Sequence, residues 1–174
     1  FLAAADAILV TEDATNLGAL LRRLGRSQEA IEHYQRWLIR FPDQVPLRLN
    51  AVNCVLELQQ FERAADWIRA GLDANAEHPE LLLAQARLSQ RQGQIKLARQ
   101  LLEAVVASSP LLLGAWLELA LVCHQQGDQA GALRANAQAT ALAPESAAAW
   151  GNQITLLTEL GKLEPVSYTH LRAH

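Results

Sequence analysis

The sequence predicts an all-α fold, a solenoid in which antiparallel helix pairs repeat every 34 residues. Hydrophobic residues make up 51% of the chain and charged residues 19%, and the commonest types, Ala, Leu, Gln, Glu and Arg, are good helix formers. Nine glycines and six prolines are too few for a turn-rich all-β chain, and 5% aromatic residues is low for a sandwich or barrel. Small and turn-forming residues also recur at one fixed spacing.

Four columns of the sequence share that spacing of 34 residues. The columns are Gly25, Gly93, Gly127 and Gly161, then Ala30, Ala64, Ala98 and Ala132, then Pro42, Pro110 and Pro144, and finally Trp116 and Trp150. Gln59 fills the gap in the glycine column, and Ala76 fills the gap in the proline column. A period shared by independent columns predicts stacked structural repeats.

Each unit is predicted to form two helices. In the fourth unit, residues 115–126 form an apolar helix, Gly127 and Asp128 break it, and residues 129–142 form a second helix that ends before Pro144. The recurring alanine lets the two helices approach closely. Larger residues fill the space around it, namely Leu17, Leu21, Tyr34 and Leu38 in the first unit.

The array is predicted over residues 11–164, with units that start near 11, 45, 79, 113 and 147, the last one truncated. Residues 1–10 are expected to be the remnant of a preceding repeat helix. Residues 165–174 break the period, and their sequence looks like a translated adaptor, so we interpret them as a non-native tail. A natural irregular C-terminus is the alternative.

At these positions the chain resembles the tetratricopeptide repeat family. The first unit carries the family pattern at Leu17, Gly18, Leu21, Gly25, Ala30, Tyr34 and Pro42. The resemblance implies a right-handed superhelical solenoid whose concave face, built mainly from the first helix of each pair, holds peptides or partner helices. The second unit differs most from the family pattern. Its Gly71 is expected to destabilise the helix by up to ~1 kcal/mol relative to Ala.

Several function classes are disfavoured by composition and motifs. The formal net charge of −3 provides no basic field for nucleic acid. No apolar run reaches the ~18 residues that span a membrane. Cys54 and Cys123 lie far apart in the sequence, and we interpret them as thiols packed in the core. Unpaired cysteines are typical of proteins in a reducing compartment, so a cytoplasmic location is favoured. We predict no metal and no cofactor.

An enzyme site is also not predicted. Cys123 and His124 are the only adjacent Cys/His pair, but consecutive helical side chains do not face each other. His33 is expected on the surface of a second helix and His78 in a loop. The four tryptophans are expected to pack in the core rather than to stack on a cofactor, and they are Trp37, Trp67, Trp116 and Trp150.

The candidate binding residues lie on the predicted first helices. One column contains Asn16, Asn50 and Asn152, with Ala84 and Glu118 between them. In the similar repeats of O-linked N-acetylglucosamine transferases, asparagines in this column hold the backbone of an extended polypeptide. An amide can satisfy both a peptide C=O and a peptide N–H, and Asn53 would widen the contact. The alternative is that these amides are solvated or bond to neighbouring helices.

Arginines accompany the asparagine column. Arg22 and Arg23 lie near the end of the first unit's first helix, and Arg87 and Arg91 share one face of the third unit's first helix. They are predicted to hold acidic side chains or a carboxylate, with solvated surface charges as the alternative. The carboxylate clamp of chaperone-binding family members is disfavoured, because Thr15 and Leu49 stand where its lysine is expected.

The sequence therefore predicts a protein–protein interaction scaffold that binds an extended polypeptide or a partner helix, as the non-catalytic arm of a larger protein. One alternative is a self-assembly scaffold. Another is the substrate-presenting region of a glycosyltransferase. An enzymatic function of this segment would require Cys123 or a histidine with a strongly shifted pKa in a pocket.

Overall fold

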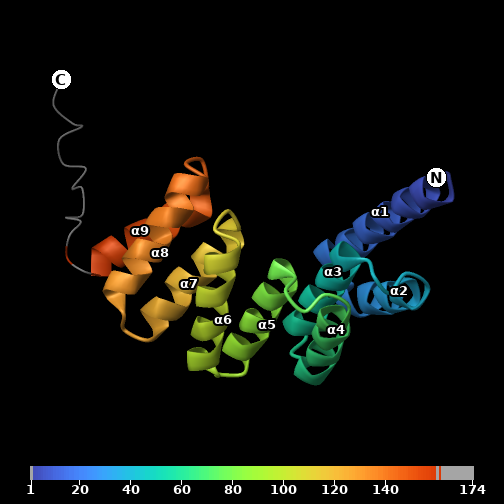
Figure 1. Ribbon diagram of the computed structural model, residues 1–174, viewed down its shortest axis with the longest axis horizontal. Helices are drawn as coiled ribbons and strands as arrows, with labels where there is room; N and C mark the ends of the chain where they lie inside the picture. The colour runs from blue at the N-terminus through green and yellow to red at the C-terminus, as the bar shows by residue number, and fades with distance from the viewer. Residues whose placement is uncertain (1, 160, 162–174) are drawn as a thin grey trace. The chain divides into compact units, whose positions relative to one another are not determined.

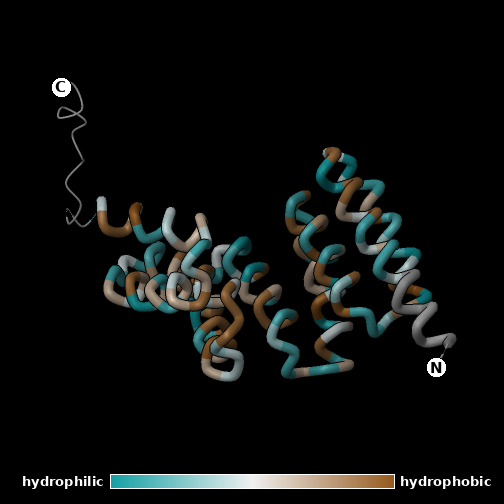
Figure 2. The backbone as a smooth tube through the Cα atoms, turned by 90° about the horizontal axis from the view of Figure 1, so that it is seen from above, coloured by the Kyte–Doolittle hydropathy of each residue, from teal (hydrophilic) through white to brown (hydrophobic). Residues whose placement is uncertain are grey.

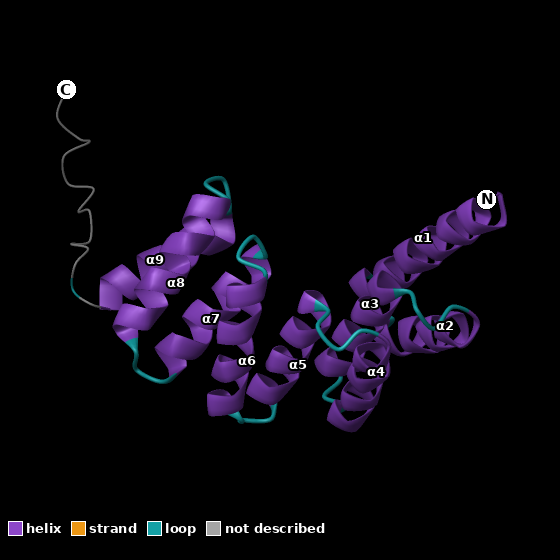
Figure 3. Cartoon of the chain, in the orientation of Figure 1, coloured by secondary structure: helices purple, strands orange, loops and turns teal. Residues whose placement is uncertain are grey.

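The computed structural model describes residues 2–159 and 161, and the side chains from residue 11 onward. The described residues form helices joined by short loops (Figure 3). In chain order (Figure 1) the helices are α1 (Leu2–Arg23), α2 (Ser27–Arg40), α3 (Val45–Glu57), α4 (Phe61–Ala74), α5 (Pro79–Arg91), α6 (Ile95–Ser108), α7 (Leu113–Gln125), α8 (Gln129–Leu142) and α9 (Ala147–Glu159). This is the all-α helical repeat solenoid that the sequence predicts.

The chain divides into two compact units, residues 1–101 and residues 102–174, and the boundary falls within α6. In the first unit each helix packs against the next from α1 to α5, and the first helices also touch one another, α1 against α3 and α3 against α5. In the second unit α7 packs against α8, α8 against α9, and α7 against α9. Each unit therefore contains a face made of first helices side by side.

The turn inside each helix pair has one backbone geometry. Gly25, Gly93 and Gly127 have φ between 74° and 78°, the left-handed region that glycine enters at little cost. The residue after the turn donates its N–H to a carbonyl five residues earlier, as Asp128 does to Cys123 at 2.9 Å, which closes the end of the first helix. Gln59 adopts the same conformation with φ 56°. The gap in the glycine column is therefore a gap in residue type and not in structure.

The core is built where a small residue of one helix meets a large residue of the next. The alanine column is completely buried in all four units. In the first pair the Tyr34 ring lies over Gly18, where an added Cβ would come within 2.2 Å of the ring, and the Tyr34 hydroxyl donates to the Thr15 carbonyl at 3.2 Å. Brown and teal residues are interspersed along the helical tube in Figure 2, as expected of helices that bury one face and expose the other.

One prediction about the first pair needs correction. Residues 1–10, expected to be the remnant of a preceding repeat helix, continue without a break into α1, which runs from Leu2 to Arg23, and their assignment to a preceding repeat stays a prediction. The prediction that His33 lies on the surface is wrong, since this side chain is only 9% exposed. Its Nε2 lies 2.8 Å from the Ala14 carbonyl oxygen, so the ring donates there, and this hydrogen bond satisfies the polar group on burial.

The tryptophans are less buried than the sequence predicts. Trp37 is half-buried and stacks on Phe41 with ring centroids 5.7 Å apart, and Trp67 is half-buried beneath the Arg63 guanidinium. Trp116 is half-buried, whereas Trp150 is 50% exposed. The indoles of Trp116 and Trp150 instead fasten the preceding loops, because their Nε1 atoms donate to the carbonyls of Pro110 and Pro144. The predicted tail, residues 165–174, lies outside the described residues.

Candidate peptide-binding face

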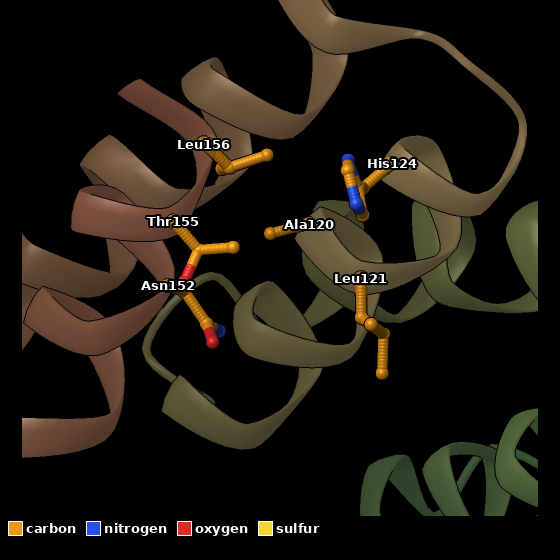
Figure 4. Close-up of a pocket in the computed structure, with 6 residues that line it drawn as sticks. All are labelled: Ala120, Leu121, His124, Asn152, Thr155 and Leu156. Atoms are coloured by element: carbon orange, nitrogen blue, oxygen red, sulfur yellow. The ribbon is translucent and has the colours of Figure 1, made fainter. Parts of the chain in front are cut away.

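A pocket of about 90 Å³ opens on the first-helix face of the second unit. It lies between α7 and α9 (Figure 4) and is lined by Ala120, Leu121, His124, Asn152, Thr155 and Leu156. Figure 4 shows the α7 and α9 side chains on opposite sides of the opening, with Ala120 directed toward Thr155. Of the asparagines in the predicted column, Asn152 is the one that lines this pocket.

A histidine and a carboxylate stand at one end of the pocket. His124 Nε2 lies 3.4 Å from Glu159 Oε2, so α7 and α9 are joined by this pair when the ring is charged. His124 Nδ1 is shielded from solvent and has no hydrogen-bond partner among the described residues. At the other end, the half-buried Asn152 brings a donor and an acceptor. The pocket therefore combines an apolar interior with hydrogen-bonding groups at its rim.

The other predicted asparagines belong to the first unit. Asn16 is exposed on α1, and Asn50 and Asn53 are half-buried on α3. The Asn50 amide Nδ2 donates one of its two N–H groups to the Pro46 carbonyl at 2.9 Å, which leaves the second N–H and Oδ1 for a guest chain. Pro46 belongs to the same helix, α3, so this bond is not the contact with a neighbouring helix that the sequence analysis gives as an alternative.

The predicted arginines have different environments. Arg22 forms an ion pair with Glu57 on α3 at 2.7 Å, so its charge is already shared between two first helices. Arg87 is half-buried, and Arg23 and Arg91 are exposed at the ends of α1 and α5. Their role in binding acidic groups stays a prediction. Of the four, Arg23 and Arg91 present the most accessible charge.

Sequence reasoning missed the most deeply placed cation of the first unit. Arg48 on α3 is 6% exposed, and it donates to the carbonyls of Trp67 at 2.9 Å and Pro42 at 2.5 Å. Burial lowers the pKa of its guanidinium. Its side chain passes over Gly71, where an added Cβ would meet Arg48 Cδ at 2.7 Å. Gly71 therefore provides room for a buried arginine, which is a role beyond the loosened helix expected from its type.

The thiols have the character predicted for packed core residues. Cys54 and Cys123 are buried and unbonded to each other. Burial raises the pKa of Cys54 to about 11, so the thiol is protonated and weakly nucleophilic near neutral pH. Among the described residues, no cluster of His, Cys, Asp and Glu has the arrangement of a metal site.

Two family models match the repeats of this chain. Two models, each described as tetratricopeptide repeat, match residues 21–88 and residues 83–147. Together they cover most of the chain without a gap between them. The chain belongs to the tetratricopeptide repeat family. Proteins of this family bind other proteins or peptides, and their repeat arrays are in general non-catalytic scaffolds.

Solved structures of tetratricopeptide repeat proteins share the fold. TTC0263, a thermophilic member from Thermus thermophilus, is 17% identical with a TM-score of 0.74, over 87% of this chain and 83% of that one. Pseudomonas aeruginosa pilF is 15% identical with a TM-score of 0.74, over 90% and 72%. YrrB, described as a tetratricopeptide repeat protein with an unusual peptide-binding site, is 20% identical with a TM-score of 0.56, over 87% and 78%. No curated protein matches the chain.

The chain is therefore a protein–protein interaction scaffold of the tetratricopeptide type. Within the described residues, no helix combines the length and apolarity needed to cross a bilayer.

Proposed function

We propose that this scaffold binds an extended polypeptide or a partner helix on the faces formed by its first helices. The observation that carries the proposal is the pocket between α7 and α9, because it opens on such a face and includes Asn152 from the predicted asparagine column. An apolar recess with a few convergent polar groups at its rim is the usual form of a recognition site.

The proposal is tested by peptide selection followed by affinity measurement. Twelve-residue peptides from a random display library are selected on the chain and measured by fluorescence anisotropy. Replacing Asn16, Asn50 and Asn152 together by Ala should weaken binding, by about 2- to 10-fold for each rung that contacts the guest. The matched control replaces Gln100 and Gln138 by Ala, since both are exposed amides on second helices. Unchanged affinity in the asparagine variant, or an equal loss in the control, would contradict the proposal.

The glycosyltransferase context extends this proposal and rests on the asparagine column. By the resemblance given in the sequence analysis, Asn16, Asn50 and Asn152 would correspond to the asparagines of O-linked N-acetylglucosamine transferases, and a substrate-presenting arm would use them to hold a polypeptide backbone. Because Asn50 donates one N–H to Pro46, its second N–H and its carbonyl oxygen would take part. The sequence of the complete gene tests this context, since it requires a glycosyltransferase catalytic domain on the same chain.

Self-assembly is a second candidate function, favoured by exposed leucines on α1. Leu17 and Leu20 are 49% and 51% exposed, whereas the residues 34 positions later, Ala51 and Cys54, are completely buried in α3. The same face is therefore covered in the second pair and open in the first. Light scattering on a chain without residues 165–174 measures the oligomeric state. A dimer that Leu20→Glu dissociates would support this function, and a monomer at all concentrations would exclude it.

A further inference from the structure

We propose that the pocket between α7 and α9 is a specificity subsite for one small aliphatic side chain, of alanine or valine size, in an extended peptide. In the bound state a rotation of the His124 side chain exposes Nδ1, which is shielded in the free chain, and Nδ1 accepts a backbone N–H of that peptide. This inference rests on the proposed function, because it assigns the residue preference of the same binding face.

The size of the pocket sets the upper limit for the side chain. Its volume of about 90 Å³ is smaller than the ~150 Å³ of a cavity that accommodates benzene. Ala120 creates the space, since it is buried on α7 where the corresponding residue of α3 is Val52. A small aliphatic group fills such a volume, whereas an aromatic ring would exceed it and leave part of its apolar surface in water.

The lining of the pocket is predominantly hydrocarbon. Ala120, Leu121 and Leu156 contribute methyl and methylene groups. The Thr155 hydroxyl is already used, because it donates to the Gly151 carbonyl at 3.0 Å, so this residue presents its methyl group to a guest. A polar side chain would lose its hydration here without finding a partner at the pocket floor.

The unpaired ring nitrogen indicates which backbone group lies beside the side chain. Glu159 Oε2 faces Nε2 at 3.4 Å, and a carboxylate favours a proton on the nitrogen that it faces. In the neutral ring Nδ1 is then an acceptor, and a shielded acceptor without a donor costs free energy. A peptide N–H supplies that donor. A peptide carbonyl or a carboxylate does not, and a carboxylate would also meet the charge of Glu159.

The pocket-filling test uses two threonines on the same helix. Thr155 and Thr158 are both exposed on α9, and each hydroxyl donates to the carbonyl four residues earlier, but only Thr155 lines the pocket. Thr155→Leu should fill the pocket, and Thr158→Leu is the matched control. Circular dichroism confirms that both variants keep the helical content of the parent chain.

The probes are N-acetyl amino acid N′-methylamides of Ala, Val, Phe and Asp, titrated against the chain while the methyl signals of the pocket residues are followed by NMR. We expect saturable shifts at Ala120, Leu121 and Leu156, with half-saturation at a concentration at least about threefold lower for Val than for Phe or Asp. Thr155→Leu should abolish these shifts, and Thr158→Leu should leave them unchanged. Equal response to Val and Phe, or no shift at the pocket methyls, would overturn the inference.

The hydrogen bond to His124 is tested with probes that lack a donor. Val probes methylated at the acetylated nitrogen, or carrying a methyl ester in place of the N′-methylamide, each lose one N–H. One of the two should bind at least about threefold more weakly than the parent probe, and His124→Phe should remove that difference. Two probes as strong as the parent would overturn the assignment of Nδ1.

The library-selected peptides separate this inference from the proposed function. If they bind Thr155→Leu as tightly as the parent chain but lose affinity on replacement of the asparagines, the subsite is wrong and the binding face stands. If the asparagine replacements have no effect either, both proposals fail.

Discussion

The loops that lead into α3 and into α7 are closed by the same hydrogen bond made with different chemistry. At the start of α3, Arg48 donates to the carbonyl of Pro42, six residues earlier. At the start of α7, Trp116 donates to the carbonyl of Pro110, also six residues earlier. Arg48 is buried and charged, and Trp116 is half-buried and neutral. The repeat therefore preserves the bond between loop and helix rather than the residue that makes it.

The two solutions make different demands on their surroundings. The guanidinium brings a second hydrogen bond, to the Trp67 carbonyl on α4, and it requires Gly71 on the same helix to leave space for its stem. The Trp116 indole makes its one hydrogen bond close to solvent, and because it is uncharged it does not require a glycine to make room for it. A buried arginine thus couples loop, first helix and second helix, whereas the tryptophan couples the loop and the first helix.

The largest loss of stability is expected when the Arg48 side chain is removed, and a smaller loss when the Trp116 hydrogen bond is removed. Arg48→Ala should lower the free energy of unfolding by about 2–3 kcal/mol, because two carbonyls lose their donor and the buried stem leaves a void. Trp116→Phe should cost about 0.5–1 kcal/mol, since one solvent-near hydrogen bond is lost and the ring remains. Urea unfolding followed by circular dichroism compares them. Equal losses for the two variants would contradict the difference drawn between the loops.

A smaller effect is expected at the glycine beneath Arg48. Gly71→Ala should destabilise the chain by about 1–2 kcal/mol despite the better helix propensity of alanine, because the new Cβ would meet Arg48 Cδ at 2.7 Å and Leu81 Cδ1 at 2.8 Å. Gly151→Ala on α9 is the matched control. An added Cβ there has no atom within 4 Å, so this variant should gain up to ~1 kcal/mol. Differential scanning calorimetry should show melting shifts of opposite sign. A higher melting temperature for both variants would show that the Arg48 and Leu81 side chains can move to accommodate a Cβ at position 71.

A gain in stability is expected at the turn that joins α3 and α4. Gln59 has φ 56°, where a residue with a Cβ is strained, whereas Gly25, Gly93 and Gly127 occupy the corresponding turns. Gln59→Gly should therefore stabilise the chain by about 1 kcal/mol, measured by urea unfolding. The control is Gln60→Gly, one residue later with φ −82°, which should not stabilise the chain. Loss of stability on Gln59→Gly would mean that the Gln59 side chain outweighs its backbone strain.

The sequence predicts the helix pairs, their turns and their small-residue contacts, because these depend on residue types that repeat at one spacing. It does not predict Arg48, since the column that contains it holds Ala14, Leu82 and Trp116 and gives no sign of a buried cation. The burial of His33 escapes prediction for the same reason. It depends on the Ala14 carbonyl 19 residues away, and such a pairing is visible only once the helices are packed.

The candidate site could be anticipated in part. The asparagine column identifies Asn152, but periodicity alone does not indicate that its neighbours His124, Thr155 and Leu156 form a pocket with it. In the sequence, His124 draws attention only as the neighbour of Cys123. His124 and Glu159 are 35 positions apart, one more than the repeat period. They therefore occupy different repeat positions, and periodicity gives no indication that they form a pair.

The loop between α4 and α5 differs from both closures compared above. It turns through a hydrogen bond from the His78 N–H to the Asn75 carbonyl, but Ala76 stands in place of the proline and Leu82, whose side chain has no donor, in place of Arg48 or Trp116. The α4–α5 connection therefore lacks the bond between loop and first helix that Arg48 and Trp116 supply elsewhere, and its geometry depends on the backbone alone at that point.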